Sequence, residues 1–142
     1  MFIFVLNMER KVYKKLLDWK KTRKRKPLLL QGARQVGKTY LLKEFGKKEY
    51  SKVFYLNFES DKRLDSLFRT SIEPAAIISK LRIFLNEDFD IDTTLLIFDE
   101  IQSSERALSS LKYFNEDENE YHIAAAGSLL GIAMNRKEYS FP

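Results

Sequence analysis

Short apolar runs alternate along the chain with longer segments whose apolar residues recur every three or four positions. The short runs have the length of strands, and they cover residues 28–31, 53–58, 95–99 and 122–126. The helical spacing covers residues 12–19, 41–45, 64–68, 77–85 and 107–114. Strands that are separated by helical crossovers form parallel sheets with helices on both faces. The pattern therefore predicts an α/β fold.

Local signals predict where some of these helices begin and end. Gly46 follows an apolar helical face and is expected to end that helix, as glycines often do. Ser104 precedes another apolar face and is expected to cap that helix at its N-terminus. Residues 71–74 have the composition of a cap region ahead of the helix over 77–85.

The segment GARQVGKT, from Gly32 to Thr39, fits the phosphate-binding pattern G-x-x-x-x-G-K-[ST]. A predicted strand precedes it and a predicted helix follows, which is the context that a P-loop requires and which argues against a chance match. Backbone N–H groups of such a loop bind phosphate oxygens, Lys38 reaches the β- and γ-phosphates, and the Thr39 hydroxyl coordinates Mg²⁺. The predicted nucleotide-binding residues are Gly32, Ala33, Arg34, Gln35, Val36, Gly37, Lys38, Thr39 and Tyr40.

Two adjacent carboxylates, Asp99 and Glu100, end the apolar run LLIF. Ligands of α/β sheets bind outside the carboxyl ends of the strands, where this pair would emerge. Asp99 then matches the aspartate that holds Mg²⁺, so Thr39 and Asp99 are the predicted metal-binding residues. Glu100 is the predicted general base for an attacking water, which favours hydrolysis over phosphoryl transfer to a small molecule. The alternative is a pair of solvated carboxylates at a strand end.

Composition limits the other chemistry that is open to the chain. Its 142 residues fit one domain, and 44% of them are hydrophobic. The absence of cysteine excludes disulfides and thiolate metal sites and predicts a reducing, cytoplasmic location. A single histidine excludes multi-histidine metal sites. The apolar start Met1–Leu6 is too short to span a bilayer, and no longer apolar stretch follows, so no membrane association is expected.

The positive charge is concentrated at the N-terminus. Residues 1–26 carry ten basic and two acidic side chains, a net charge of +8, whereas the fifteen basic and eighteen acidic side chains of residues 27–142 give −3. The basic run Lys20–Lys26 has the charge to contact nucleic-acid phosphates or an acidic partner. A solvated linker between a helix and the first strand is the simpler interpretation, and we favour it.

Together these segments resemble the bacterial and archaeal AAA-superfamily ATPases that join a P-loop domain to a C-terminal domain of unknown function. The matching parts are the first helix with Trp19 and the segments LLLQGARQVGKT, YLNFES, LLIFDEIQ, HIAAAGSLLG and YSFP. The resemblance implies a three-layer α/β/α P-loop NTPase fold of the AAA type, with ATP and Mg²⁺ as cofactors. It also implies adenine rather than guanine as the base of the nucleotide, since no guanine-reading motif stands out in the sequence.

The resemblance adds two site residues. Ser128 falls where sensor 1 would lie, so the implied catalytic residues are Glu100, Lys38 and Ser128. The alternative for Ser128 is an N-cap for a helix that begins at Leu129, and the two roles are compatible. Gln102, close behind the acidic pair, is implied to help report the nucleotide state.

Similar proteins continue beyond Pro142 through a fifth strand, more helices and a further domain. We therefore expect an N-terminal helix and basic linker over 1–26, and over 27–142 an ATPase core that is truncated at its C-terminus and lacks the fifth strand. That strand would lie beside Leu28–Gln31, so these residues are expected to form an exposed apolar edge, open to self-association or to a protein partner.

Three functions follow as hypotheses. The first is Mg²⁺-dependent ATP binding with ATP hydrolysis, if the truncated core is competent. The second is a nucleotide-binding module for sensing or interaction, without turnover. The third and weakest is nucleic-acid binding through the basic arm.

Overall fold

One sheet of five parallel strands forms the centre of the computed structural model, which describes residues 2–3, 9–22, 26–32, 37–116 and 120–128. The strand order is β1-β2-β5-β4-β3. The strands are β1 (Phe2–Ile3), β2 (Leu28–Gly32), β3 (Lys52–Asn57), β4 (Thr94–Asp99) and β5 (His122–Ser128). The helices are α1 (Glu9–Lys21), α2 (Lys38–Glu49), α3 (Arg63–Ser66), α4 (Pro74–Leu85) and α5 (Glu105–Glu116), with a short 3₁₀ helix, η2 (Ile101–Ser103).

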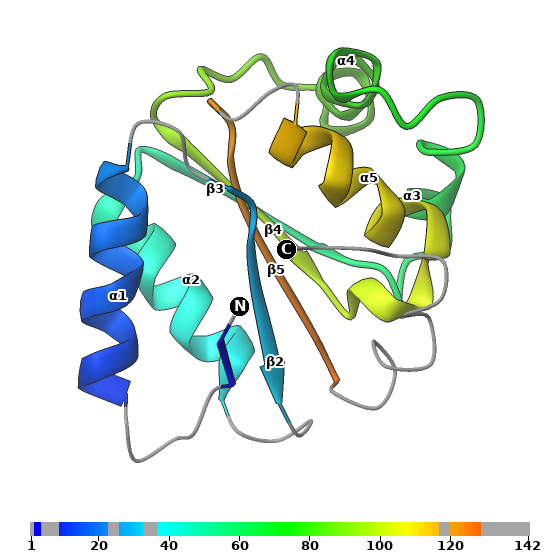
Figure 1. Cartoon of the computed structure of the whole chain (residues 1–142). Helices are drawn as coiled ribbons and strands as arrows, with labels where there is room; N and C mark the ends of the chain where they lie inside the picture. The colour runs from blue at the N-terminus through cyan, green and yellow to red at the C-terminus, as the bar shows by residue number, and fades with distance from the viewer. Residues whose placement is uncertain (1, 4–8, 23–25, 33–36, 117–119, 129–142) are drawn as a thin grey trace.

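Helices cover both faces of this sheet, as the sequence predicts. Figure 1 shows α1 and α2 on one side of the strands and α4 and α5 on the other. The first side buries a cluster that includes Val12 and Leu16 of α1 with Phe45 of α2. The second side buries a larger cluster, to which α4 contributes Ile77 and α5 contributes Leu111. The three-layer α/β/α fold is therefore confirmed.

The two central strands explain why the sheet must be covered on both faces. Every residue of β4 is buried, and so is every residue of β5 except Ser128. Parallel strands that are enclosed by helices read as continuous apolar runs, which is the pattern over residues 95–98 and 123–126. The carboxyl ends of β2, β4 and β5 therefore open at the same edge of a rigid, solvent-excluded scaffold.

The edge of β2 differs from the sequence-based expectation. Phe2 and Ile3 pair in parallel register with Leu30 and Gln31, so the edge that was expected to be bare is occupied at these two positions. Two residues are too few to show a periodicity, so the sequence pattern predicts no strand at the start of the chain. The fifth strand of the described sheet is thus β1, from the N-terminal end of the chain.

Gly46 also differs from expectation, because it does not end its helix. The helix α2 continues to Glu49, and Gly46 is buried within it. A methyl carbon added at Gly46 would lie 2.7 Å from Cγ2 of Val53 and 3.0 Å from Cδ2 of Leu95. The glycine is therefore needed for close packing of α2 on β3 and β4, and not for a helix terminus.

This packing gives a prediction for stability. Alanine normally stabilises a helix by about 1 kcal/mol relative to glycine, but an overpacked core loses about 1–3 kcal/mol. We expect Gly46→Ala to lower the free energy of unfolding by about 1 kcal/mol in urea denaturation. Lys47→Ala, at the exposed next position of the same helix, is the control and should change stability little. An increase in the stability of Gly46→Ala would contradict this packing.

Other helix ends agree with the sequence. Ser104 Oγ accepts a hydrogen bond of 3.2 Å from the backbone N–H of Ala107, so Ser104 caps α5 as predicted. The long helix α4 begins at Pro74, the last residue of the predicted cap region. None of the helices in the described part of the chain combines the length and the apolarity needed to cross a bilayer.

Candidate functional site

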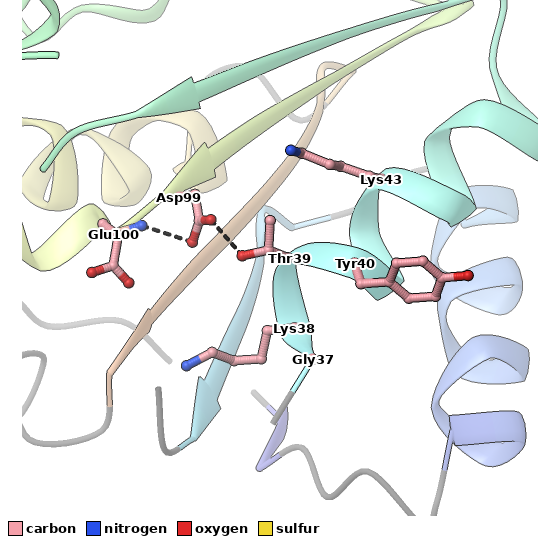
Figure 2. A pocket seen from close by; sticks show the side chains of 7 residues that line it. All are labelled: Gly37, Lys38, Thr39, Tyr40, Lys43, Asp99 and Glu100. Atoms are coloured by element: carbon pink, nitrogen blue, oxygen red, sulfur yellow. Dashed lines mark hydrogen bonds between the residues drawn. The ribbon is translucent and has the colours of Figure 1, made fainter. Parts of the chain in front are cut away.

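Six of the predicted site residues meet at the carboxyl edge of the sheet, around a cavity of about 440 Å³. The described residues that line it are Gly37, Lys38, Thr39, Tyr40, Lys43, Asp99 and Glu100. The first five come from Gly37 and the N-terminal half of α2, and the two carboxylates come from the last residue of β4 and the residue after it (Figure 2). Residues about 60 positions apart in sequence thus line one cavity. Their closeness follows from the parallel fold and not from either motif by itself.

The start of α2 places Lys38 at the floor of this site. Gly37 has a φ of 80° and a ψ of 18°, a left-handed conformation that glycine adopts without steric cost, and α2 begins at the next residue. The Lys38 side chain is only 5% exposed. Its ammonium donates a hydrogen bond of 2.8 Å to the carbonyl oxygen of Gly127, near the end of β5. The helix N-terminus and a buried cation therefore point at one region, which favours an anionic ligand.

The Asp99 side chain accepts three hydrogen bonds. The Thr39 hydroxyl donates to its Oδ2 at 2.6 Å, and the backbone N–H of Glu100 donates to its Oδ1 at 2.8 Å. The hydroxyl of Tyr55, on β3, donates to Oδ2 at 2.5 Å. The carboxylate is 3% exposed, so these donors replace the water that burial removes. Its orientation is therefore fixed from three elements of the fold.

The donor set of Thr39 and Asp99 fits a hard divalent cation such as Mg²⁺. Both groups offer oxygen, and their oxygen atoms lie 2.6 Å apart beside the buried Lys38. Among the described residues, no group of three or more histidine, cysteine, aspartate or glutamate side chains forms a self-sufficient metal site. Two protein oxygens suit Mg²⁺, which commonly binds through one or two protein ligands together with substrate phosphates and water.

Glu100 has an unusual backbone conformation, with a φ of 52° and a ψ of 44°. A non-glycine residue in the left-handed region carries backbone strain, and such residues cluster at functional sites. The conformation turns the chain from β4 into η2 and directs the carboxylate toward the cavity (Figure 2). Gln102 Nε2 donates to Glu100 Oε2 at 3.2 Å, so Gln102 does contact the acidic pair.

The sequence analysis missed two residues of the site, Lys43, which lines the cavity, and Tyr55, which contacts Asp99. Burial is the largest cause that raises the pKa of Tyr55, to about 12, and the hydrogen bond to Asp99 and the charge of Asp99 add to it. The phenol is therefore protonated at neutral pH and acts as a hydrogen-bond donor. The sequence signal is strand alternation, which puts Tyr55 and Asn57 on one face of the predicted strand. The position of that strand beside β4 comes from the structure.

Ser128 ends β5 and is paired in register with Gly32 at the end of β2. It is partly exposed, at the same edge of the sheet as Lys38 and Asp99. Residues 33–36 of the predicted loop lie outside the described residues, as does the helix predicted from Leu129. The sensor role and the N-cap role of Ser128 both stay predictions.

The described part of the basic arm packs against the body of the protein. Lys20 Nζ donates to the carbonyl oxygen of Glu49 and lies 4.7 Å from the centroid of the Tyr50 ring, so it caps the C-terminus of α2. Trp19 Nε1 donates to the carbonyl oxygen of Lys26 at 2.6 Å. Residues 23–25 lie outside the described residues. Nucleic-acid binding by this arm stays a prediction.

The chain has the three features of P-loop nucleotide-binding proteins. These are a parallel sheet between two layers of helices, a phosphate-binding motif between β2 and α2, and acidic residues at the end of β4. A protein-family model described as an AAA domain matches residues 24–141. The chain therefore belongs to the AAA-domain family, which supports nucleotide binding, with ATP as the ligand. No curated protein matches the chain. The C-terminal domain that the sequence resemblance implied stays untested.

Proposed function

We propose that this protein binds ATP with Mg²⁺ and hydrolyses it to ADP and phosphate. The observation that carries the proposal is the convergence of Lys38, Thr39, Asp99 and Glu100 on one cavity. A buried cation, two oxygen donors for a metal and a separate carboxylate are the groups that phosphoryl transfer to water requires. We further propose that residues 27–142 form the nucleotide-binding core, with residues 1–26 as an accessory N-terminal part.

In this proposal the start of α2 binds the triphosphate. Backbone N–H groups and the Lys38 ammonium donate to the phosphate oxygens, and Lys38 exchanges the Gly127 carbonyl for a charged acceptor. Thr39 and Asp99 would hold Mg²⁺, which supplies neutralisation of the negative charge on the β- and γ-phosphates. The Tyr40 side chain is 64% exposed and lines the same cavity, so it is available to the nucleoside part of the ligand.

Glu100 is the proposed general base. A water molecule attacks the γ-phosphorus, its proton passes to the Glu100 carboxylate, and the bond between the γ-phosphorus and the bridging oxygen of ADP breaks. Gln102 donates to Oε2 of Glu100 and so orients the carboxylate that receives the proton. We propose that Ser128 donates a hydrogen bond to the γ-phosphate or to this water from the end of β5.

The test is phosphate release by the purified wild-type protein with ATP, measured in Mg²⁺ and again in excess EDTA. The proposal expects steady release that requires Mg²⁺. Binding of ATP without any release would overturn hydrolysis and leave nucleotide binding intact.

One observation favours a second candidate, a nucleotide-binding module that does not turn ATP over. The hydrogen bond from Gln102 occupies Oε2 of Glu100, so this oxygen takes a proton from water only by giving up that contact. This candidate predicts that ATP raises the melting temperature of the protein while no phosphate appears. A cytoplasmic location stays a prediction from the cysteine-free sequence.

A further inference from the structure

A chain of four hydrogen bonds connects the turn after β3 to the proposed metal-binding carboxylate. We infer that Tyr55 is a positioning residue, whose hydroxyl is oriented by Asn57 so that it holds the Asp99 carboxylate ready for the cation. The inference rests on the proposed function, because it concerns how Asp99 binds Mg²⁺. Nothing in the P-loop motif or in the acidic pair requires a tyrosine at this place.

The first link fixes the side chain of Asn57. Its Oδ1 accepts hydrogen bonds from the backbone N–H groups of Glu59 and Ser60, at 2.9 and 3.0 Å. Backbone N–H groups only donate, so the atom that faces them must be the amide oxygen. The amide nitrogen of Asn57 consequently faces the Tyr55 hydroxyl, and it donates to that oxygen at 3.2 Å.

The second link fixes the direction of the Tyr55 proton. A phenol carries one O–H proton, and its oxygen here already accepts from Asn57. The proton is therefore free to point at Oδ2 of Asp99, 2.5 Å away. The Lys43 ammonium lies 3.9 Å from the centroid of the Tyr55 ring and holds the ring from its face. The backbone N–H groups after β3, the Asn57 amide and the Tyr55 hydroxyl thus form a series of hydrogen bonds that ends on the Asp99 carboxylate, which we call the relay.

The relay has a consequence for metal binding. Thr39 and Tyr55 donate to one oxygen of Asp99, and the Glu100 N–H donates to the other, so the carboxylate does not need to be ordered when a cation binds. Residues that orient a metal ligand commonly change the metal affinity by about 10- to 100-fold when they are replaced. Tyr55 is therefore expected to set the Mg²⁺ requirement of nucleotide binding.

Tyr55→Phe tests this inference, because phenylalanine keeps the ring beside Lys43 and removes only the hydroxyl. The measurement is a Mg²⁺ titration at a fixed ATP concentration, in which the melting temperature of the protein is the readout. We expect the half-saturating Mg²⁺ concentration to rise by about tenfold. The melting temperature without ligand is recorded as well, since a purely structural role would lower that value and leave the Mg²⁺ midpoint unchanged.

Tyr13→Phe is the matched control. The Tyr13 hydroxyl also donates to a carboxylate, at 3.3 Å to Oε2 of Glu49, but this pair joins α1 to the end of α2 and lies outside the cavity. Its removal should leave the Mg²⁺ midpoint where it is. An unchanged midpoint in Tyr55→Phe, or an equal rise in Tyr13→Phe, would overturn the inference. If the wild-type protein does not respond to ATP and Mg²⁺ at all, the proposed function itself fails.

Asn57→Asp tests the earlier link of the relay. Aspartate keeps an oxygen for the Glu59 and Ser60 N–H groups and replaces the amide donor with an acceptor, which competes with Asp99 for the Tyr55 proton. The substitution is made in the wild type and in the Tyr55→Phe variant. The relay predicts different changes of the Mg²⁺ midpoint in the two backgrounds, because the competition requires the Tyr55 hydroxyl. Equal changes would show that Asn57 does not act through Tyr55.

Discussion

Lys38→Ala is expected to weaken ATP binding by about 100-fold or more, because each hydrogen bond to a charged group contributes about 1.5–3 kcal/mol. The Lys38 ammonium is buried, and one of its hydrogen-bond acceptors is the neutral carbonyl of Gly127. A phosphate oxygen is a better acceptor for a buried cation than a carbonyl oxygen. Affinity is measured by calorimetry with ATP and Mg²⁺.

Two further variants make this result interpretable. Lys47→Ala removes the same charge from the exposed, opposite end of α2 and should bind ATP like the wild type. Lys38→Met keeps most of the buried side-chain volume, so it tests the charge if the alanine variant is not folded. A folded Lys38→Met variant with wild-type affinity would remove Lys38 from the binding site.

Glu100→Gln is expected to bind ATP as the wild type does and to release phosphate about 10²- to 10⁴-fold more slowly, which is the usual contribution of a general base. Glutamine has the shape of glutamate, so the left-handed backbone at this position is under the same strain. The amide cannot accept the proton of an attacking water. Phosphate release under single-turnover conditions measures the chemical step directly.

The matched control for this charge is Glu105→Gln, an exposed carboxylate in the first turn of α5. It should release phosphate at the wild-type rate. Loss of ATP binding in Glu100→Gln would contradict the assignment, since it would make Glu100 a ligand-binding group. An unchanged rate of release would mean that another group accepts the proton.

The predictable part of the site is the part that is local in sequence. The loop from Gly32 to Thr39 and the pair at Asp99 and Glu100 each form a short motif, and the parallel fold brings the ends of β2 and β4 to one edge. One motif follows β2 and the other ends β4, and ligands bind at this edge of the sheet. The closeness of Thr39 and Asp99 therefore follows from the two motifs and the fold.

The parts that were missed depend on distances across the fold. Gly46 carries the sequence signal of a helix end, and only the closeness of Val53 and Leu95 shows that it is a packing glycine. Tyr55 reads as an ordinary aromatic strand residue until β3 is placed in register beside β4. Phe2 and Ile3 pair with β2 through backbone groups, which leave no mark on the side-chain pattern.

The central claim is that the cavity at the start of α2 binds ATP together with Mg²⁺. We would titrate the folded wild-type protein with ATP by calorimetry, once in Mg²⁺ and once in excess EDTA. The account predicts saturable binding at one site per chain that is clearly tighter in Mg²⁺. A folded sample that binds no ATP under either condition would contradict it.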